Sequence, residues 1–189
     1  ILIIAIVAII ATTSARTIQH PGIPKEFVES GRVDPKNKIQ LQFAIKQNTQ
    51  GKERLEKELL ARSDPENAEM YGKWFSKVDI DDMLRNTIST NAVKNFVEKH
   101  FHNDAYELTT GGDFLQVFTT VEKVELMVKS QYHHYTHVNG KTTVIRLAGE
   151  YEMPNEIAEH VDFIGPSHRF PLVQSLKLGK TVSSPDETV

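Results

Sequence analysis

The segment Ile39-Gln40-Leu41-Gln42-Phe43-Ala44-Ile45 alternates apolar and polar side chains over most of its length. A period of two predicts a β-strand with one buried face and one exposed face. Helical spacing of apolar residues follows over 52–62, 78–84, 93–101 and 121–128. Further strands are predicted over 105–110, 114–118, 132–138 and 142–147, with turn signals at Gly111-Gly112 and Asn139-Gly140.

The order of these elements is strand, helices, hairpin, helix, hairpin. It favours an α+β fold, in which an antiparallel β-sheet carries helices on one face. A split βαβ, ferredoxin-like arrangement fits this order. A short helix is expected from Pro154 to Glu159, and the helix that carries Val93, Phe96, Val97 and Phe101 is expected to be capped by Ser89 or Thr90. Residues 16–38 contain three prolines and two glycines, which predicts an irregular lead-in.

Composition places the chain among soluble globular proteins of one domain. Of its 189 residues, 39% are hydrophobic and 25% charged. The formal net charge of -3 gives no basic field, so no nucleic-acid partner is expected. The chain has no cysteine, so its stability rests on core packing without disulfides.

The N-terminal residues 1–11 are all apolar and precede the small residues Thr12-Thr13-Ser14-Ala15. This pattern predicts a signal peptide over 1–15 whose positively charged first part is missing. Eleven apolar residues are too few for a bilayer span, which needs roughly 20. We therefore expect entry into the secretory route and no membrane association after signal removal. Residues 172–189 have the polar, Ser/Pro/Gly-containing composition of a linker.

Catalytic motifs are absent from the sequence. There is no G-x-S-x-G elbow, no H-E-x-x-H pair, no glycine-rich phosphate loop and no cysteine nucleophile. The acidic run Asp79-Ile80-Asp81-Asp82 lacks the glycine and the terminal glutamate of a calcium loop, which favours an acidic helix start. These residues alone are therefore not expected to form an enzyme or to hold a metal or cofactor.

The cluster His133, His134 and His137 lies in a predicted strand. His133 and His137 share a face and stand about 13 Å apart, too far for one metal ion. Cross-strand packing is one interpretation and pH sensing is the other. His160 and His168 are further candidates for pH sensing. The aromatic stretch Tyr71-Gly72-Lys73-Trp74-Phe75 is interpreted as a packed turn, in preference to a ligand cage.

The segment His160-Val161-Asp162-Phe163-Ile164-Gly165-Pro166-Ser167-His168-Arg169-Phe170-Pro171 combines histidine, aspartate, arginine and phenylalanine within twelve residues. Neither a helical nor a strand period describes it. Its large apolar side chains are buried either within the domain or in a partner. Aromatic residues and arginine are typical of interface centres. The candidate docking residues are His160, Asp162, Phe163, His168, Arg169 and Phe170.

Several short motifs together resemble the propeptide of the sedolisin (serine-carboxyl) peptidases, also called the pro-kumamolisin activation domain. The resemblance covers residues 39–171 and is nearest to the tripeptidyl-peptidase branch of that family. The motifs are Ser63-Asp64-Pro65 followed by Tyr71-Gly72-Lys73-Trp74, then Asp113-Phe114-Leu115, Glu125-Leu126, Tyr132-His133-His134-Tyr135, Met153-Pro154, and the segment from His160 to Pro171.

The resemblance implies an activation propeptide. In this family the propeptide folds as an antiparallel sheet with helices and covers the active-site side of a subtilisin-like catalytic domain, its partner in cis or in trans. It assists folding, inhibits the peptidase and is removed by proteolysis in acid. The catalytic domain carries a Ser-Glu-Asp triad and a calcium site, and neither is in this chain. The implied locations are the secretory pathway, a lysosome or other acidic vesicle, and the cell exterior.

Two other classes of function remain open at this point. One is a free-standing secreted peptidase inhibitor or chaperone of the same fold. The other is a small-molecule binding module, since ferredoxin-like sheets host many functions. A ligand-sized apolar pocket with converging polar groups would favour the second class.

Overall fold

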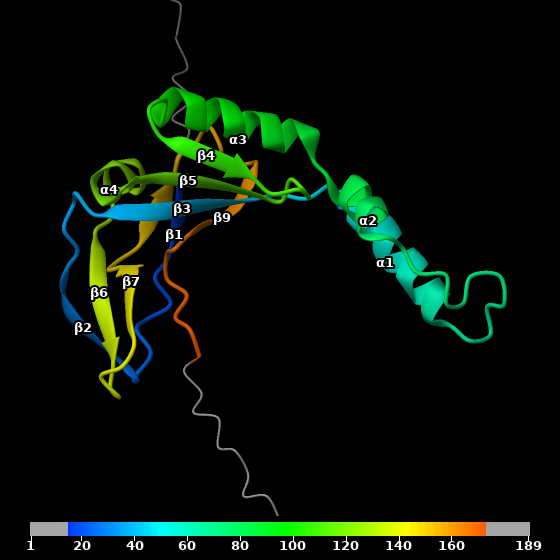
Figure 1. Cartoon of the computed structure of the whole chain (residues 1–189), viewed down its shortest axis with the longest axis horizontal. Helices are drawn as coiled ribbons and strands as arrows, with labels where there is room; N and C mark the ends of the chain where they lie inside the picture. Colours follow the sequence, from blue (N-terminus) through cyan, green and yellow to red (C-terminus); the bar gives the residue numbers. More distant parts are fainter. Residues whose placement is uncertain (1–14, 173–189) are drawn as a thin grey trace, which may run out of the picture.

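The computed structural model describes residues 15–172 (Figure 1). The expected signal peptide and linker lie almost entirely outside these residues. No helix between residues 15 and 172 is long and apolar enough to cross a membrane. The elements are β1 Arg16–Ile18, β2 Phe27–Arg32, β3 Lys38–Ile45, α1 Thr49–Ser63, α2 Lys77–Leu84, α3 Thr87–His100, β4 Ala105–Leu108, β5 Phe114–Thr120, α4 Val121–Val128, β6 Tyr132–His137, β7 Thr143–Leu147, β8 Tyr151–Met153 and β9 Val161–Gly165.

A four-stranded antiparallel sheet has the order β4-β5-β3-β9. The chain between β3 and β4 forms the helices α1, α2 and α3 in that order, and α4 follows β5. The sequence of β3, α3, β4, β5, α4 and β9 is the β-α-β-β-α-β order of a ferredoxin-like unit. The predicted α+β class is therefore confirmed. A three-stranded sheet β2-β6-β7 and a two-stranded sheet β1-β8 are added to this unit.

The core lies between the four-stranded sheet and helices α3 and α4. Alternate side chains of β3 and β5, including Leu41, Phe43 and Leu115, are fully buried. The ring of Phe43 lies 6.2 Å from that of Phe96 on α3. The strand alternation of the sequence thus directs one face of the sheet toward both helices and leaves the opposite face without a helix.

Helices α1 and α2 form an arm (residues 49–84) that extends beyond the end of the sheet (Figure 1). Asn48 caps α1 by accepting from the Gly51 amide, and Ser76 and Asp79 form a capping box that starts α2. The acidic helix start predicted at Asp79 is thereby confirmed. A Cβ on Gly51 would lie 1.8 Å from the Met83 carbonyl oxygen, so the helices cross where only glycine fits.

The sequence predicted that the aromatic rings of residues 71–75, at the end of the arm, pack in a turn. This prediction is wrong for two of the three rings. Phe75 is half-buried, but Tyr71 and Trp74 are 52% and 61% exposed. The turn itself forms, as backbone hydrogen bonds link the amides of Tyr71 and Lys73 to preceding carbonyls. The ordered turn therefore displays these rings instead of burying them.

Three further predictions differ from the structure. The lead-in 16–38 contains strands β1 and β2, because distant strands β8 and β6 supply their hydrogen bonds. The residues after Pro154 form hydrogen-bonded turns, not a helix, and these turns bury Ile157 and reverse the chain into β9. Helix α3 is capped by Asn86. Ser89 and Thr90, the expected caps, are buried within its first turns.

Candidate functional site

The face of the four-stranded sheet turned away from α3 and α4 is the candidate site. In the register of the sheet, Ala44 of β3 lies between Phe114 of β5 and Phe163 of β9. The rings of Phe114 and Phe163 lie 6.4 Å apart. Phe118 and Phe163 are 45% and 46% exposed. This open sheet face consists of Lys38, Gln40, Gln42, Ala44, Ala105, Glu107, Phe114, Gln116, Phe118 and Phe163.

Polar and apolar groups alternate across the open sheet face. The side chains of Gln40 and Gln116 are hydrogen-bonded to each other at its centre. Phe114 and Phe118 flank Gln116 on the interior strand β5, and Phe163 stands on the edge strand β9. The charged residues of this face, Lys38 and Glu107, lie at its margins, at the start of β3 and on the edge strand β4. A surface with aromatic rings around satisfied amides, and with charges only at its margins, suits contact with another protein.

The segment expected to be a docking loop begins as the edge strand β9. Phe163 belongs to the open sheet face, and Asp162 is exposed at the irregularity where the β3 pairing shifts register. His160 precedes the strand and is half-buried, with its Nδ1 3.1 Å from the Ser89 hydroxyl at the start of α3. The structure thus separates these three residues: two are exposed, and one contacts its own domain.

Residues 166–170, here called the strap, fold back onto the three-stranded sheet. The Tyr132 hydroxyl donates to the Pro166 carbonyl at 2.7 Å, and burial raises the pKa of this tyrosine. The Leu147 amide donates to the Ser167 carbonyl at 3.0 Å. Phe170 packs with its ring centre 4.9 Å from Phe27 and 5.2 Å from Tyr135. Phe170 therefore fills an aromatic cluster of its own domain.

His168 is the buried member of the strap, at 7% exposure. Its Nε2 donates to the Gly149 carbonyl at 2.7 Å, and its ring lies 5.2 Å from Tyr151. Burial lowers the pKa of His168, partly offset by the Gly149 hydrogen bond, and the nearby His20 lowers it further. Arg169 beside it is exposed, while the guanidinium of Arg146 donates to its carbonyl.

His20 is a partner that sequence reasoning missed. Its ring lies 4.4 Å from that of His168. Its Nδ1 accepts from the Gly22 amide at 2.9 Å, and its buried Nε2 has no hydrogen-bond partner within the described part of the chain. The only signal in the sequence was its place among prolines and glycines, which indicated a loop. The structure uses it to join the N-terminal segment to the strap.

The histidines of β6 lie on the three-stranded sheet, apart from the open sheet face. His133 Nδ1 lies 2.6 Å from a Glu29 carboxylate oxygen on β2, and His137 packs edge-on against Phe27 at 5.1 Å. His134 is half-buried on the same strand. Between residues 15 and 172, no group of three or more histidines or carboxylates is arranged to hold a metal ion.

A groove of about 970 Å³ runs along the strap and reaches Phe163. The loop 18–24, Arg146 and Tyr151 line its other side. The Arg146 guanidinium already donates to the carbonyls of Ile145 and Arg169. The groove is open and largely apolar, and its charged group, the Arg146 guanidinium, already has hydrogen-bond partners. These properties favour a polypeptide ligand over a small polar ligand. It extends the open sheet face on the side of β9.

Comparison with known proteins supplies the family. The family described as "Pro-kumamolisin, activation domain" matches residues 25–170. The chain belongs to this family. Tripeptidyl-peptidase 1 from Macaca fascicularis and from Homo sapiens are each 32% identical over 161 residues, which covers 84% of this chain and 28% of each relative. Tripeptidyl-peptidase 1 from Mus musculus is 34% identical over 151 residues, covering 79% of this chain and 26% of the relative.

The chain spans less than a third of the length of these curated relatives. An activation domain accompanies a peptidase in one precursor, so the family points to a catalytic domain as the partner of this fold. Phe163 and Phe114, two of the residues on the open sheet face, lie within motifs that suggested the resemblance from sequence alone.

Proposed function

We propose that the chain is the inhibitory and folding-assisting propeptide of an acid-activated serine-carboxyl peptidase of the tripeptidyl-peptidase type. In this proposal the open sheet face covers the catalytic domain, and proteolysis at low pH removes the propeptide. The parent is a serine-type peptidase of the sedolisin family that travels the secretory pathway to a lysosome, another acidic vesicle or the cell exterior. The chain itself contributes no catalytic group.

The observation that carries the proposal is the exposure of Phe118 and Phe163 on a sheet face that no helix covers. Aromatic side chains at the centre of an interface supply much of its binding free energy. The same face in an isolated domain would leave these rings in water. A partner that covers the sheet therefore gains their burial, and the family supplies the class of that partner.

The histidine contacts support release in acid. The ring of His168 is buried beside His20, and burial disfavours its charged form. His20 accepts a hydrogen bond from the Gly22 amide through Nδ1, which only a neutral imidazole can do. Two imidazolium charges at a ring separation of 4.4 Å would repel each other. Acid therefore weakens the contact that holds the strap, which adjoins β9 and the open sheet face.

The experiment is inhibition in trans of the mature peptidase from the same precursor near neutral pH. The wild-type chain is expected to inhibit, and Phe163→Ala with Phe118→Ala is expected to raise the inhibition constant about tenfold or more. Leu126→Ala, which changes an exposed apolar residue on α4, is the matched control and is expected to inhibit like wild type. A wild-type chain that does not inhibit the peptidase would contradict the proposed function.

A further inference from the structure

The arm carries exposed apolar residues of its own, separate from those of the open sheet face. Neither α1 nor α2 buries a residue. Leu60 and Val78 are exposed along its helices, and the aromatic rings of Tyr71 and Trp74 are exposed in the tip (residues 64–76). Exposed apolar side chains that gather in one region mark interaction sites, and tyrosine and tryptophan are enriched at interfaces.

The tip is held in one conformation by Arg62. Its guanidinium donates to the Lys73 carbonyl and pairs with Glu58 at 3.2 Å. The same guanidinium lies 4.0 Å from the centre of the Phe75 ring. The Gly72 amide donates to the Arg62 carbonyl at 3.0 Å. Arg62 thus contacts the loop on both sides of Trp74. When an ordered loop presents a ring, binding of that ring loses less conformational entropy.

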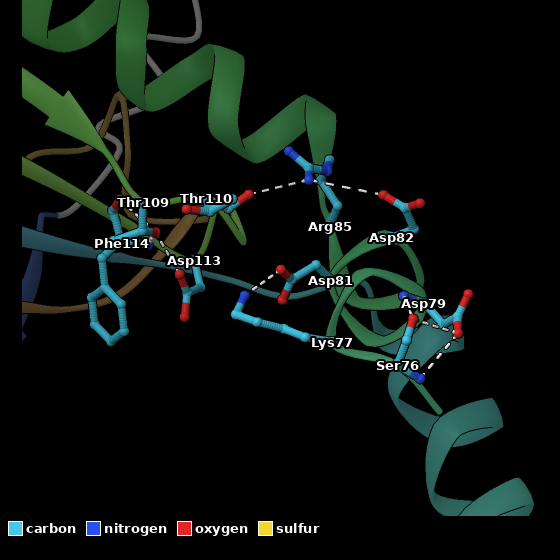
Figure 2. A network of polar contacts seen from close by, with 10 residues as sticks. All are labelled: Ser76, Lys77, Asp79, Asp81, Asp82, Arg85, Thr109, Thr110, Asp113 and Phe114. Carbon is cyan, nitrogen blue, oxygen red and sulfur yellow. Dashed lines mark hydrogen bonds and ion pairs between the residues drawn. The ribbon is translucent and has the colours of Figure 1, made fainter. Parts of the chain in front are cut away.

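The base of the arm is tied to the β4–β5 hairpin. Figure 2 shows Arg85, at the end of α2, between Asp82 and the Thr110 carbonyl, to which it donates at 3.2 Å. The Asn48 amide donates to the Leu84 carbonyl at 2.9 Å, which joins the start of α1 to the end of α2. Because both ends are tied, the direction of the arm relative to the sheet is set by the fold.

The charge of the chain is concentrated in the arm. Residues 49–84 contain six lysines and arginines and nine aspartates and glutamates, which gives a formal charge of -3. This equals the net charge of the whole chain, so the remaining residues are balanced. Complementary charge steers association. A partner of the arm is therefore expected to offer an apolar pocket with basic residues around it.

From these observations we propose that the tip of the arm is a second docking contact, in which Tyr71 and Trp74 enter an apolar pocket on the catalytic domain of the same precursor. The inference rests on the proposed function for the identity of its partner. In Figure 1 the arm descends from the end of the sheet, on the side away from α3. A body that covers the open sheet face is thus beside the arm as well.

The length of the relatives supports this occupant. The chain matches only 28% of the human and macaque relatives, so most of such a precursor lies outside the domain described here. A contact through both the sheet and the arm spreads the interface over two separate parts of the propeptide. The second contact, through the arm, then fixes the orientation of the sheet on the peptidase.

The first test compares inhibition constants for the mature peptidase of the same precursor. Tyr71→Ala with Trp74→Ala is expected to weaken inhibition about tenfold or more, mainly through faster dissociation. Val28→Ala, an exposed apolar residue of β2, is the matched control. If the wild-type chain inhibits and the double variant inhibits equally well, the arm is not a contact, while the proposed function still stands.

The second test does not depend on inhibition. A photo-crosslinking amino acid at position 74 of the full-length precursor is expected to crosslink to the catalytic part of the same molecule. The same amino acid at position 28 is the control and is expected to give no such product. Crosslinks from position 74 only to a second copy of the chain would overturn the inference and assign the tip to self-association, and so would the absence of any crosslink.

Discussion

His168 and His20 show how single residues join the two ends of the described chain. His168 donates to Gly149 through Nε2, and His20 accepts from Gly22 through Nδ1. The role of His20 requires a neutral imidazole, since a protonated ring has no acceptor nitrogen. Protonation of His20 removes the Gly22 hydrogen bond, and protonation of His168 places a charge in a buried position. Both changes weaken the contact between loop 18–24 and the strap.

We therefore predict that His168 makes the domain less stable in acid. Burial lowers its pKa in the folded state, so the unfolded chain binds the proton more readily. The stabilisation is present above the ordinary pKa of about 6.5 and is lost as the pH falls through the lower, folded-state value. In His168→Gln, the free energy of unfolding is expected to fall less between about pH 7 and 5 than in wild type.

The measurement is urea unfolding across that pH range, with His102→Gln as the control at an exposed histidine after α3. The control is expected to follow the wild-type profile. Equal losses of unfolding free energy in wild type and His168→Gln would show that the acid sensitivity lies elsewhere.

Among the elements, the arm depends on a single close approach. Helix α1 lies so near α2 at Gly51 that the helices can cross there only because glycine has no side chain. Gly72 in the tip has a positive φ of 73°, a conformation that glycine adopts without strain. The two helices bury no residue and so add little to the core. The ordered conformation of the arm therefore depends on the helix caps, on this crossing and on the Arg62 contacts.

Gly51→Ala is expected to separate the two helices of the arm. Alanine gains about 1 kcal/mol of helix propensity over glycine, but its Cβ would meet the Met83 carbonyl at 1.8 Å. The clash is with backbone, so the helices must move apart. Hydrogen exchange over residues 49–84 is expected to become faster while exchange in the four-stranded sheet is unchanged.

Gly149→Ala is the matched control, because nothing lies within 4 Å of the Cβ that it adds. It is expected to leave exchange in the arm unchanged. Wild-type exchange rates in the arm of Gly51→Ala would mean that the helices do not approach as closely as described.

At the scale of the whole molecule, the strap links docking to pH. It follows β9, which carries Phe163 of the open sheet face, and it is anchored by Tyr132, Arg146 and the His168 contacts. His160 lies at the other end of β9, against Ser89. Two histidines thus flank the strand that we assign to docking. We therefore expect changes at either end of β9 to alter the position of Phe163.

We predict that the complex with the peptidase dissociates faster as the pH falls from about 6.5 to 4.5. A histidine held neutral in the complex has a bound-state pKa below its free value, so its contribution is lost as the pH falls through that window. The variant His160→Gln with His168→Gln is expected to show a flatter dependence of dissociation rate on pH. His133→Gln with His134→Gln, on the three-stranded sheet, tests the other two candidate histidines.

Identical pH profiles for all three proteins would assign the acid response to the catalytic domain. Titrating groups on the peptidase act equally on every propeptide variant, so the comparison between variants isolates the contribution of this chain.

The sequence by itself determined the elements whose patterns are local. The alternation of Ile39 to Ile45, the turn signal Asn139-Gly140 and the helical spacing at Val93, Phe96 and Val97 each specify an element without reference to distant residues. Their order was enough for the ferredoxin-like class, because few topologies accept it. The order and spacing of short motifs identified the family.

Only the tertiary structure decided which surfaces are free. Strand β2 forms because β6, about a hundred residues away, supplies its partners, and no local pattern reports such a pairing. Phe170 and Phe163 look alike in the sequence, yet the strap packs the half-buried Phe170 into an aromatic cluster and the register of β9 exposes Phe163. His20 meets His168 across most of the chain length. Burial is a property of contacts between distant segments, so exposure, docking and acid sensitivity emerge only when the chain has folded.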